Sequence, residues 1–356
     1  MGAKVLWSEH CSMAIAKRVA VFIGTRPEAI KMAPVVAALA AEPGLVPLVI
    51  NAGQHREMMQ QVIDLFGLVV DADLDAMQPS QTLAGLTARL VERCDRALAD
   101  LTPDMVLVQG DTTTVLCAAL AAFYRRLPIG HVEAGLRTGN LASPFPEEAN
   151  RRLVSPLCDL HFAPTETAQQ ALLAERIDPQ RILVTGNTVI DALLLEVERQ
   201  RRPAVREALH AELAGIAGGD VFTRPMVLVT GHRRENFGGG FEQICAALAD
   251  LARQRPELVI VYPVHLNPRV QEVVHERLSE RENIRLIAPQ PYAPFVALAA
   301  ASRLILTDSG GVQEEAPTLG KPVLVMRDTT ERPEGVAAGA VKLVGPQADR
   351  IVAETL

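Results

Sequence analysis

From residue 18 onward, short β-rich runs alternate with longer segments in which apolar residues recur at helical spacing. The predicted strands span residues 19–24, 45–50, 105–110, 128–134, 160–164 and 181–186, followed by 226–231, 258–264, 283–289, 303–309, 322–327 and 340–345. The predicted helices include residues 28–41, 81–100, 115–124, 187–201, 241–254 and 268–279. This repeated strand–helix–strand pattern predicts an α/β fold whose parallel sheets are covered by helices on both faces.

The strands fall into two sets, which predicts two doubly wound Rossmann-like domains that face each other across a cleft. Residues 202–224 mix charged residues, glycines and proline, so we place the domain linker near them. A length of 356 residues also favours two domains, because domains average roughly 150 residues. The predicted organisation is an extension at residues 1–17, a first domain at 18–201 and a second domain at 202–356.

Composition excludes several classes of protein. Hydrophobic residues make up 49% of the chain and charged residues 22%, which indicates a globular protein. A net charge of -7 argues against nucleic acid or an anionic membrane as the main partner. Five scattered cysteines without a C-x-x-C pair indicate neither a disulfide framework nor a zinc site, and no pair of histidines has the H-x-x-x-H spacing. No apolar run approaches the ~20 residues that span a bilayer, and Glu9 and His10 interrupt any secretory signal, so we expect a cytoplasmic protein without a metal.

The stretch at residues 303–334 joins a predicted strand to a helix through Asp-Ser-Gly-Gly. Glycines allow close approach of the backbone to a ligand, and the free N–H groups of a first helical turn favour an anion such as phosphate. The sequence thus predicts an anion-binding turn at Gly310 and Gly311. One of the carboxylates of Glu314 and Glu315 could accept hydrogen bonds from both hydroxyls of a ribose, or both could simply complement the helix dipole.

Cationic side chains follow predicted strands in both domains. Arg26 and Lys31 come after the first strand, where they could meet phosphate or lie on the surface of an amphipathic helix. His232 and the two arginines after it follow another strand, where they could neutralise a leaving diphosphate; His265 is more typical of a structural or regulatory residue. The sequence contains neither the dinucleotide-binding motif G-x-G-x-x-G nor the Walker motif G-x-x-x-x-G-K-[ST]. This argues against a protein that uses a redox cofactor or hydrolyses ATP.

Carboxylates at strand and loop ends of the first domain form a candidate acid–base group. Asp111, Glu133 and Glu147 are its members, although Asp111 could be only the N-cap of the next helix. Glu148 is more typical of a solvated helix N-terminus than of a functional residue. The sequence H-V-E ending at Glu133 matches the start of a zinc deaminase motif, but no P-C-x-x-C follows, so that interpretation is rejected.

Taken together and in order, these segments resemble the non-hydrolysing UDP-N-acetylglucosamine 2-epimerase family. The matching strings are GTRPEAIKMAP, AGQHREMM, QGDTTT, HVEAGLRTGN, PFPEEANRR, TGHRRENFG, PVHLNP, TDSGGVQEEAPTLGKPVLVMRDTTERPE and AVKLVG. The resemblance implies the two-domain glycosyltransferase-B type of fold, a homodimer, and reversible inversion at C2 of UDP-GlcNAc to give UDP-ManNAc through 2-acetamidoglucal, without NAD or another cofactor.

The resemblance also implies roles for individual residues. The acid–base residues would be Asp111, Glu133 and Glu147, with His232 aiding departure of the diphosphate. The ligand contacts would be Arg26 and Lys31 to the UDP-sugar, Gln290 and Phe295 to uracil, Ser309, Gly310 and Gly311 to the diphosphate, Glu315 to ribose, and Arg332 in the cleft. Some family members bind a second UDP-GlcNAc as an activator, in a region that would contain Gln54, His55, Arg233 and His265.

One departure from the family pattern concerns the C-terminus. The pattern continues through an N-P-[FY]-G-D-G-x-A segment into a final helix that returns to the first domain, whereas this chain ends at Leu356. We therefore expect a truncated C-terminal helix and no strap across the hinge. Three alternative functions stay open at this point: a hydrolysing epimerase that releases free ManNAc, a glycosyltransferase of the same fold, and a nucleotide-sugar sensor without turnover.

Overall fold

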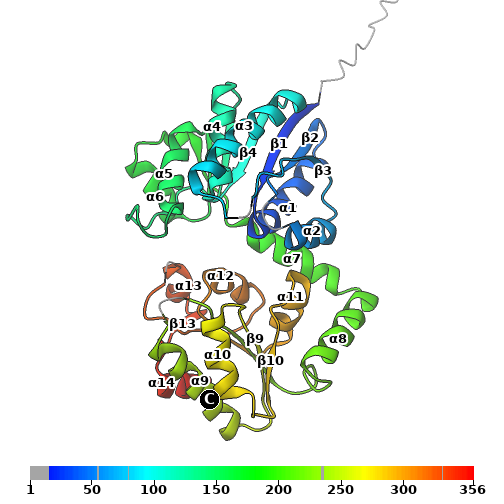
Figure 1. Cartoon of the computed structure of the whole chain (residues 1–356), viewed down its shortest axis with the longest axis vertical. Coiled ribbons are helices and arrows are strands. Elements are labelled where there is room, and N and C mark those ends of the chain that lie inside the picture. Colours follow the sequence, from blue (N-terminus) through cyan, green and yellow to red (C-terminus); the bar gives the residue numbers. More distant parts are fainter. Residues whose placement is uncertain (1–15, 54–55, 79, 234–235, 331) are drawn as a thin grey trace, which may run out of the picture. The chain divides into compact units, whose positions relative to one another are not determined.

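The apolar runs form the strands of two parallel sheets, one in each of two compact units of the chain, Met1–Thr188 and Val189–Leu356 (Figure 1). The computed structural model describes residues 16–53, 56–78, 80–233, 236–330 and 332–356. The boundary between the units lies at the start of helix α7, whereas the sequence-based boundary at residues 201–202 lies just after the end of this helix.

The first unit contains a seven-stranded parallel sheet with strand order β3-β2-β1-β4-β5-β6-β7. Its strands are β1 (Lys17–Ile23), β2 (Leu45–Asn51), β3 (Val70–Asp73), β4 (Met105–Gln109), β5 (Ile129–Val132), β6 (Leu160–Ala163) and β7 (Ile182–Val184). Its helices are α1 (Arg26–Ala41), α2 (Arg56–Phe66), α3 (Leu83–Leu101), α4 (Thr113–Tyr124), α5 (Glu147–Val154) and α6 (Glu166–Ala174), with short 3₁₀ turns at Ser155–Leu157 and Pro179–Arg181.

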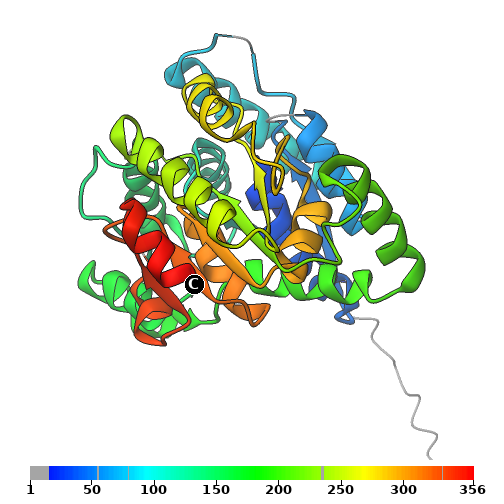
Figure 2. The same ribbon diagram turned by 90° about the horizontal axis from the view of Figure 1, so that it is seen from below.

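The second unit contains a six-stranded parallel sheet with strand order β10-β9-β8-β11-β12-β13. Its strands are β8 (Met226–Thr230), β9 (Val259–Pro263), β10 (Ile284–Ile287), β11 (Leu304–Thr307), β12 (Val323–Val325) and β13 (Val341–Leu343). Its helices are α7 (Thr188–Gln200), α8 (Pro203–Ala217), α9 (Gly239–Gln254), α10 (Pro268–Leu278), α11 (Tyr292–Ala301), α12 (Gly310–Thr318), α13 (Pro333–Ala337) and α14 (Ala348–Thr355). Helix α14 packs beside α9 (Figures 1 and 2).

Each predicted strand is present, and the fold-class prediction of doubly wound units is confirmed. The stretch that we read as a linker instead forms α8, because Pro203 is pre-organised for a first helical turn and Leu209, Leu213 and Ala217 recur at four-residue spacing and are buried. Strand β3 was not predicted. It lies at the edge of the sheet with only half-exposed and exposed residues, so it lacks the apolar run of a buried strand.

Each unit has its own hydrophobic core between its sheet and its helices. In the first unit, the alanine-rich helix α4 is buried along much of its length and packs against α3 and β4, because its small side chains permit close approach. In the second unit, α9 supplies buried residues such as Phe241, Leu248 and Leu251 to the core over β8 and β9. Within the described part of the chain, no helix is both long and apolar enough to cross a membrane.

The first sheet contains two buried histidines that should make the fold sensitive to acid. His131 and His161 are neighbours on β5 and β6, and burial lowers the pKa of each imidazole to about 4. Because the unfolded chain takes up these protons near pH 6.5, the stability that the neutral rings contribute is complete above pH 6.5 and is lost as the pH falls toward 4. The loss should approach about 3 kcal/mol for each histidine.

Urea unfolding measured from pH 7.5 to pH 4 would test this expectation, with His161→Gln as the comparison because it removes one of the titrating rings. The free energy of unfolding of the wild type should fall more steeply between pH 6.5 and pH 4 than that of the variant. Equal slopes for the two proteins in that range would contradict the assignment.

Candidate active site

The order of the strands reverses direction at one place in each sheet, and Arg26, Asp111, His232 and Ser309 lie in the loops or helix starts beside these places. In the first unit the reversal lies between β1 and β4, and in the second between β8 and β11. Ligands of open α/β sheets bind beyond the carboxyl ends of the strands at such a reversal, because the two flanking loops run apart and leave a crevice. The loops concerned begin at Gly24, Gly110, Gly231 and Asp308.

Glu133 follows β5 and is held by several donors. Lys31 Nζ lies 2.7 Å from both carboxylate oxygens, Asn187 Nδ2 donates to Oε1 at 3.1 Å, and Gln109 Nε2 donates to Oε2. The side chain is 7% exposed, and its backbone has a φ of 62°, in the left-handed region that non-glycine residues seldom adopt. Such backbone strain is concentrated at functional sites. Glu133 is thus an oriented carboxylate with an adjacent cation.

Asp111 lies in the loop after β4 and contacts helix α5. Its Oδ2 forms an ion pair with Arg151, and its backbone carbonyl accepts a hydrogen bond from Asn150 Nδ2 at 2.8 Å. The N-cap of α4 is Thr112, whose hydroxyl accepts from the Val115 amide, so the interpretation of Asp111 as the cap is wrong. The Asp111 side chain is 22% exposed and remains accessible to a ligand.

The two glutamates at the start of α5 have different surroundings. Glu148 is fully buried and accepts hydrogen bonds from the backbone amides of Thr138 and Gly139 at 3.0 and 3.2 Å, so its prediction as a solvated residue is wrong. Glu147 is half-buried and has no ion-pair partner among the residues that the structure describes. It lies one turn before Asn150, which contacts the Asp111 loop.

Glu28 was missed by the sequence analysis, although it joins the two loops at the strand reversal. Its carboxylate accepts hydrogen bonds from the amides of Gly24 and Thr25 and from the Thr112 hydroxyl at 2.6 Å. Burial raises the pKa of Glu28 to about 7, and the nearby charge of Asp111 adds to this effect, while the three hydrogen bonds oppose it. The signal in the sequence is the capping box T-x-x-E at the start of α1.

Arg26 and Lys31, the cations predicted near this loop, differ in their contacts. The Lys31 ammonium forms the ion pair with Glu133, and its side chain is 19% exposed. Arg26, the first residue of α1, is half-buried and has no carboxylate partner in the described ranges. Its guanidinium is therefore available to an anion.

In the second unit, the predicted phosphate-binding residues form the start of α12. Ser309 is the N-cap but its hydroxyl does not cap the helix, so the first-turn N–H groups at Gly310 and Gly311 remain available. A Cβ atom built on Gly310 would lie 3.6 Å from a terminal nitrogen of Arg233. Arg233, which the resemblance assigns to the activator region, thus lies beside the predicted diphosphate site. Gln54 and His55 of that region lie outside the described residues.

His232 lies between a buried carboxylate and a second histidine. Its Nδ1 is 3.4 Å from Oδ1 of Asp308, and its ring stacks on the His265 ring with centroids 5.3 Å apart. Burial lowers the pKa of His232, Asp308 raises it, and His265 and Arg233 lower it further. Asp308 was not singled out by the sequence analysis, although it precedes the glycine turn of the D-S-G-G motif.

The remaining predicted contacts lie on loops and helix starts of the same unit. Phe295 is half-buried in the first turn of α11, and Gln290 donates to the Ala288 carbonyl just before that helix. Glu315 of α12 approaches Tyr292 of α11, where burial and the neighbouring carboxylates raise the pKa of the phenol. Arg332 forms an ion pair with Glu314. The described residues contain no group of three or more metal-binding side chains.

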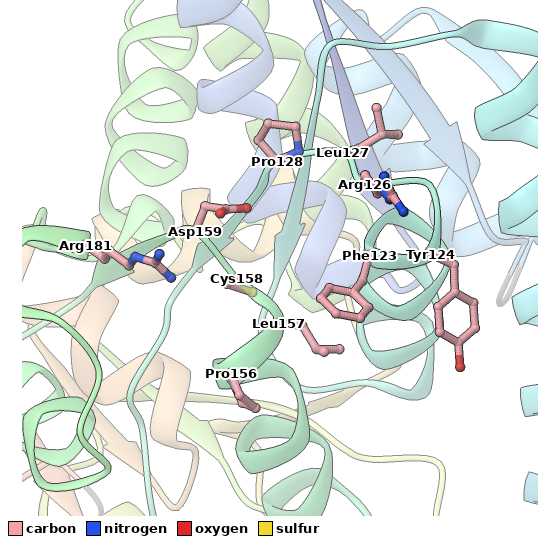
Figure 3. A pocket seen from close by; sticks show the side chains of 10 residues that line it. All are labelled: Phe123, Tyr124, Arg126, Leu127, Pro128, Pro156, Leu157, Cys158, Asp159 and Arg181. Carbon is pink, nitrogen blue, oxygen red and sulfur yellow. The ribbon is translucent and has the colours of Figure 1, made fainter.

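A cavity of about 550 Å³ in the first unit lies elsewhere (Figure 3). Its wall includes residues that come directly before β5, β6 and β7, namely Leu127 and Pro128, Asp159, and Arg181. This cavity is thus at the amino ends of the strands, whereas Asp111 and Glu133 follow their carboxyl ends. It does not contain the candidate acid–base residues.

Comparison with known proteins identifies the family. The family model described as UDP-N-acetylglucosamine 2-epimerase matches residues 37–356. The chain belongs to this family. The UDP-N-acetylglucosamine 2-epimerase of Salmonella typhimurium is 56% identical over 339 residues, which cover 95% of this chain and 89% of the relative. The family assignment makes the protein an isomerase and confirms the resemblance inferred from the motifs.

Solved structures of the epimerase family agree with this assignment. The UDP-GlcNAc 2-epimerase of Neisseria meningitidis bound to UDP-GlcNAc is 49% identical, with a TM-score of 0.85 over 95% of this chain and 90% of the relative. The epimerase of Methanocaldococcus jannaschii in complex with UDP-GlcNAc and UDP is 32% identical, with a TM-score of 0.78 over 95% and 91%. The two Rossmann-like units are thus those of a glycosyltransferase-B type epimerase.

Proposed function

We propose that the protein interconverts UDP-GlcNAc and UDP-ManNAc by eliminating UDP and adding it back, without hydrolysis. The observation that carries the proposal has two parts. In the first sheet, Asp111 lies at the strand reversal and Glu133 follows the next strand, β5. In the second sheet, an uncapped helix start with Arg233 beside it lies at the reversal. Acid–base groups and an anion-binding turn are the two parts that this reaction needs. The ligands named for the Neisseria and Methanocaldococcus relatives support the choice of substrate.

In the first step, a carboxylate removes the proton from C2 while the bond from C1 to the diphosphate oxygen breaks. The electron pair of the C2–H bond forms the C1–C2 double bond of 2-acetamidoglucal, and UDP leaves with the electrons of the C1–O bond. The C2 proton has no adjacent carbonyl to acidify it, so its loss must be coupled to departure of UDP. Stabilisation of the leaving diphosphate by cations and helix N–H groups is therefore as necessary as the base.

In the second step, UDP adds back to C1 and a proton reaches the opposite face of C2. Two faces require more than one acid–base group, which Asp111, Glu133 and Glu147 would supply. Glu133 forms an ion pair with Lys31 and Asp111 forms one with Arg151, so each carboxylate lies beside a cation. The diphosphate would be held by His232, Ser309, Gly310 and Gly311. The ribose and uracil would contact residues of α11 and α12.

The nucleoside end of UDP would lie at the start of α11 and along α12. Phe295 offers an aromatic face and Gln290 an amide for uracil, while Glu315 offers a carboxylate for the ribose hydroxyls. Arg26 and Arg332 would contact the UDP-sugar as additional cations. These assignments follow the resemblance residue by residue and agree with the chemistry of each side chain.

Incubation with UDP-GlcNAc in D₂O, without NAD or an acceptor, tests the proposed reaction. NMR should show UDP-ManNAc and deuterium at C2 of both sugars, because the carboxylate exchanges its proton with solvent between the two steps. Unchanged substrate would contradict the proposal. Free ManNAc would identify a hydrolysing epimerase, and release of UDP that depends on an acceptor would identify a glycosyltransferase.

We also propose that the protein is a homodimer, supported by an apolar surface on the first unit. Phe123 and Tyr124 at the end of α4 are 51% and 68% exposed, and Leu153 of the adjacent α5 is 56% exposed (Figure 3 shows the two aromatic residues). Exposed apolar patches often mark protein interfaces. Light scattering should give the mass of a dimer for the wild type and of a monomer for Tyr124→Glu. A monomeric wild type at micromolar concentration would contradict the proposal.

A further inference from the structure

Asp308 is a buried carboxylate on which the two loops at the strand reversal of the second unit converge. It directly follows β11 and is 0% exposed. Its Oδ2 accepts hydrogen bonds from the His232 amide at 2.9 Å, the Arg233 amide at 2.8 Å and Asn236 Nδ2 at 3.3 Å. No lysine or arginine forms an ion pair with it among the described residues. The buried charge is thus balanced by N–H donors from the loop after β8.

The second carboxylate oxygen, Oδ1, faces the imidazole of His232. It is buried, has no hydrogen-bond partner in the described part of the chain, and lies 3.4 Å from Nδ1. This distance exceeds that of an ordinary hydrogen bond by a few tenths of an ångström. Catalytic hydrogen bonds are often long before a ligand binds and shorten when it does. The His232 side chain itself is 40% exposed, so its other ring nitrogen can reach a ligand.

We propose that Asp308 is a positioning residue that holds the Nδ1–H of protonated His232, so that the imidazolium presents its Nε2–H to the leaving diphosphate. The role rests on the proposed function of His232 in departure of UDP. Asp308 is fully buried and cannot touch the substrate, so it acts through His232. Its two oxygens have different tasks: Oδ2 fixes the loop that carries His232, and Oδ1 fixes the ring and its proton.

The charges around His232 support this role. Burial, His265 and Arg233 all disfavour the protonated ring, and Asp308 is the group that favours it. His265 belongs to the loop after β9 and stacks on the ring, Arg233 is the next residue in the chain, and Asp308 comes from the end of β11. Without the Asp308 charge, the pKa of His232 would fall further and fewer molecules would carry the proton at neutral pH. An incoming diphosphate would favour the protonated ring in the same way as Asp308.

Asp308→Asn separates this role from a purely structural one. The variant keeps an oxygen that can accept from the loop amides, but it removes the negative charge beside the ring. We expect kcat for epimerisation to fall about 10²-fold, the low end for loss of a general acid, with KM changed less than threefold. The basic limb of the pH profile of kcat should move to lower pH, because His232 then loses its proton more easily.

Asn236→Ala is the matched control, because it removes one donor to Oδ2 and leaves Oδ1 beside the ring. This variant should lower the melting temperature but leave the basic limb of the pH profile in place. If Asp308→Asn and Asn236→Ala change the pH profile equally, or if neither moves it, Asp308 only holds the loop and the proposal is overturned.

A direct readout uses the full chain labelled with ¹⁵N-histidine, with His232 assigned by comparison with His232→Gln. In a pH titration followed by NMR, the neutral ring of wild-type His232 should carry its one remaining proton on Nδ1. The proton affinity of His232 should be about tenfold lower in Asp308→Asn than in the wild type. An unchanged titration in Asp308→Asn would overturn the proposal. This measurement needs no turnover, so a wild type that is inactive on UDP-GlcNAc would contradict the proposed function while the titration still decides the role of Asp308.

Discussion

Glu133→Gln is expected to slow both epimerisation and deuterium exchange at C2 of UDP-GlcNAc by about 10³-fold or more. An amide cannot take up the C2 proton, and loss of a positioned acid or base typically removes 10² to 10⁴ of the rate. The substitution also leaves the half-buried Lys31 ammonium without its counter-charge. NMR in D₂O measures the exchange, and calorimetry should show that the affinity for UDP changes less than about threefold. Asp111→Asn and Glu147→Gln should behave similarly if they are the other acid–base groups.

Glu148→Gln is the control for this prediction, because Glu148 is a buried carboxylate in the same unit that holds a loop and is given no role in proton transfer. It should reduce the free energy of unfolding by about 1 to 3 kcal/mol, the cost of weakening a buried hydrogen-bonded charge. Exchange should remain measurable in the folded variant. Normal exchange in Glu133→Gln would remove Glu133 from the acid–base group.

Gly135→Ala is expected to destabilise the protein by about 3 kcal/mol or more. Gly135 has a φ of 90°, and a Cβ atom at this position would lie 2.3 Å from the Ala168 carbonyl oxygen and 2.8 Å from its carbonyl carbon. Both contacts are with backbone of α6, so no side chain can rotate away and the loop after Glu133 would have to move. The midpoint of urea unfolding should fall accordingly.

Gly215→Ala provides the matched comparison. Gly215 lies inside α8, and a Cβ atom there would meet nothing within 4 Å. Alanine is favoured over glycine in a helix by up to about 1 kcal/mol, so this variant should be as stable as the wild type or more so. If both substitutions change the unfolding midpoint by the same amount, the steric account of Gly135 is wrong.

Most of the fold could be predicted because the strands are continuous apolar runs between glycine and proline breaks. The strand β1 and its neighbour β4, for example, are buried on both faces, so their sequences differ clearly from those of the helices. Strand β3 lies at an edge and lacks this pattern. The order of the strands could not be predicted, because it depends on pairing between segments that are far apart in the chain.

The candidate site was predictable where function depends on a local motif. The glycine turn before α12 and the residue types at the strand ends are visible in the sequence. The roles of Glu28 and Asp308 are not, because the Thr112 hydroxyl is 84 residues from Glu28 and the His232 amide is 76 residues from Asp308. A carboxylate acts as a bridge between loops only once the sheet has brought those loops together.

The pairing of the central strands also sets when, during folding, such a site can exist. Val19 pairs with Met105 and Val227 pairs with Leu304, so each strand reversal is closed by segments separated by nearly half of a unit. Contacts between distant segments form slowly because a long loop must first be ordered. On a ribosome, β1 can pair with β2 long before β4 has been synthesised. A nascent or refolding chain would therefore contain much of its helix and sheet before it has an active site, and recovery of activity would report the last step of folding.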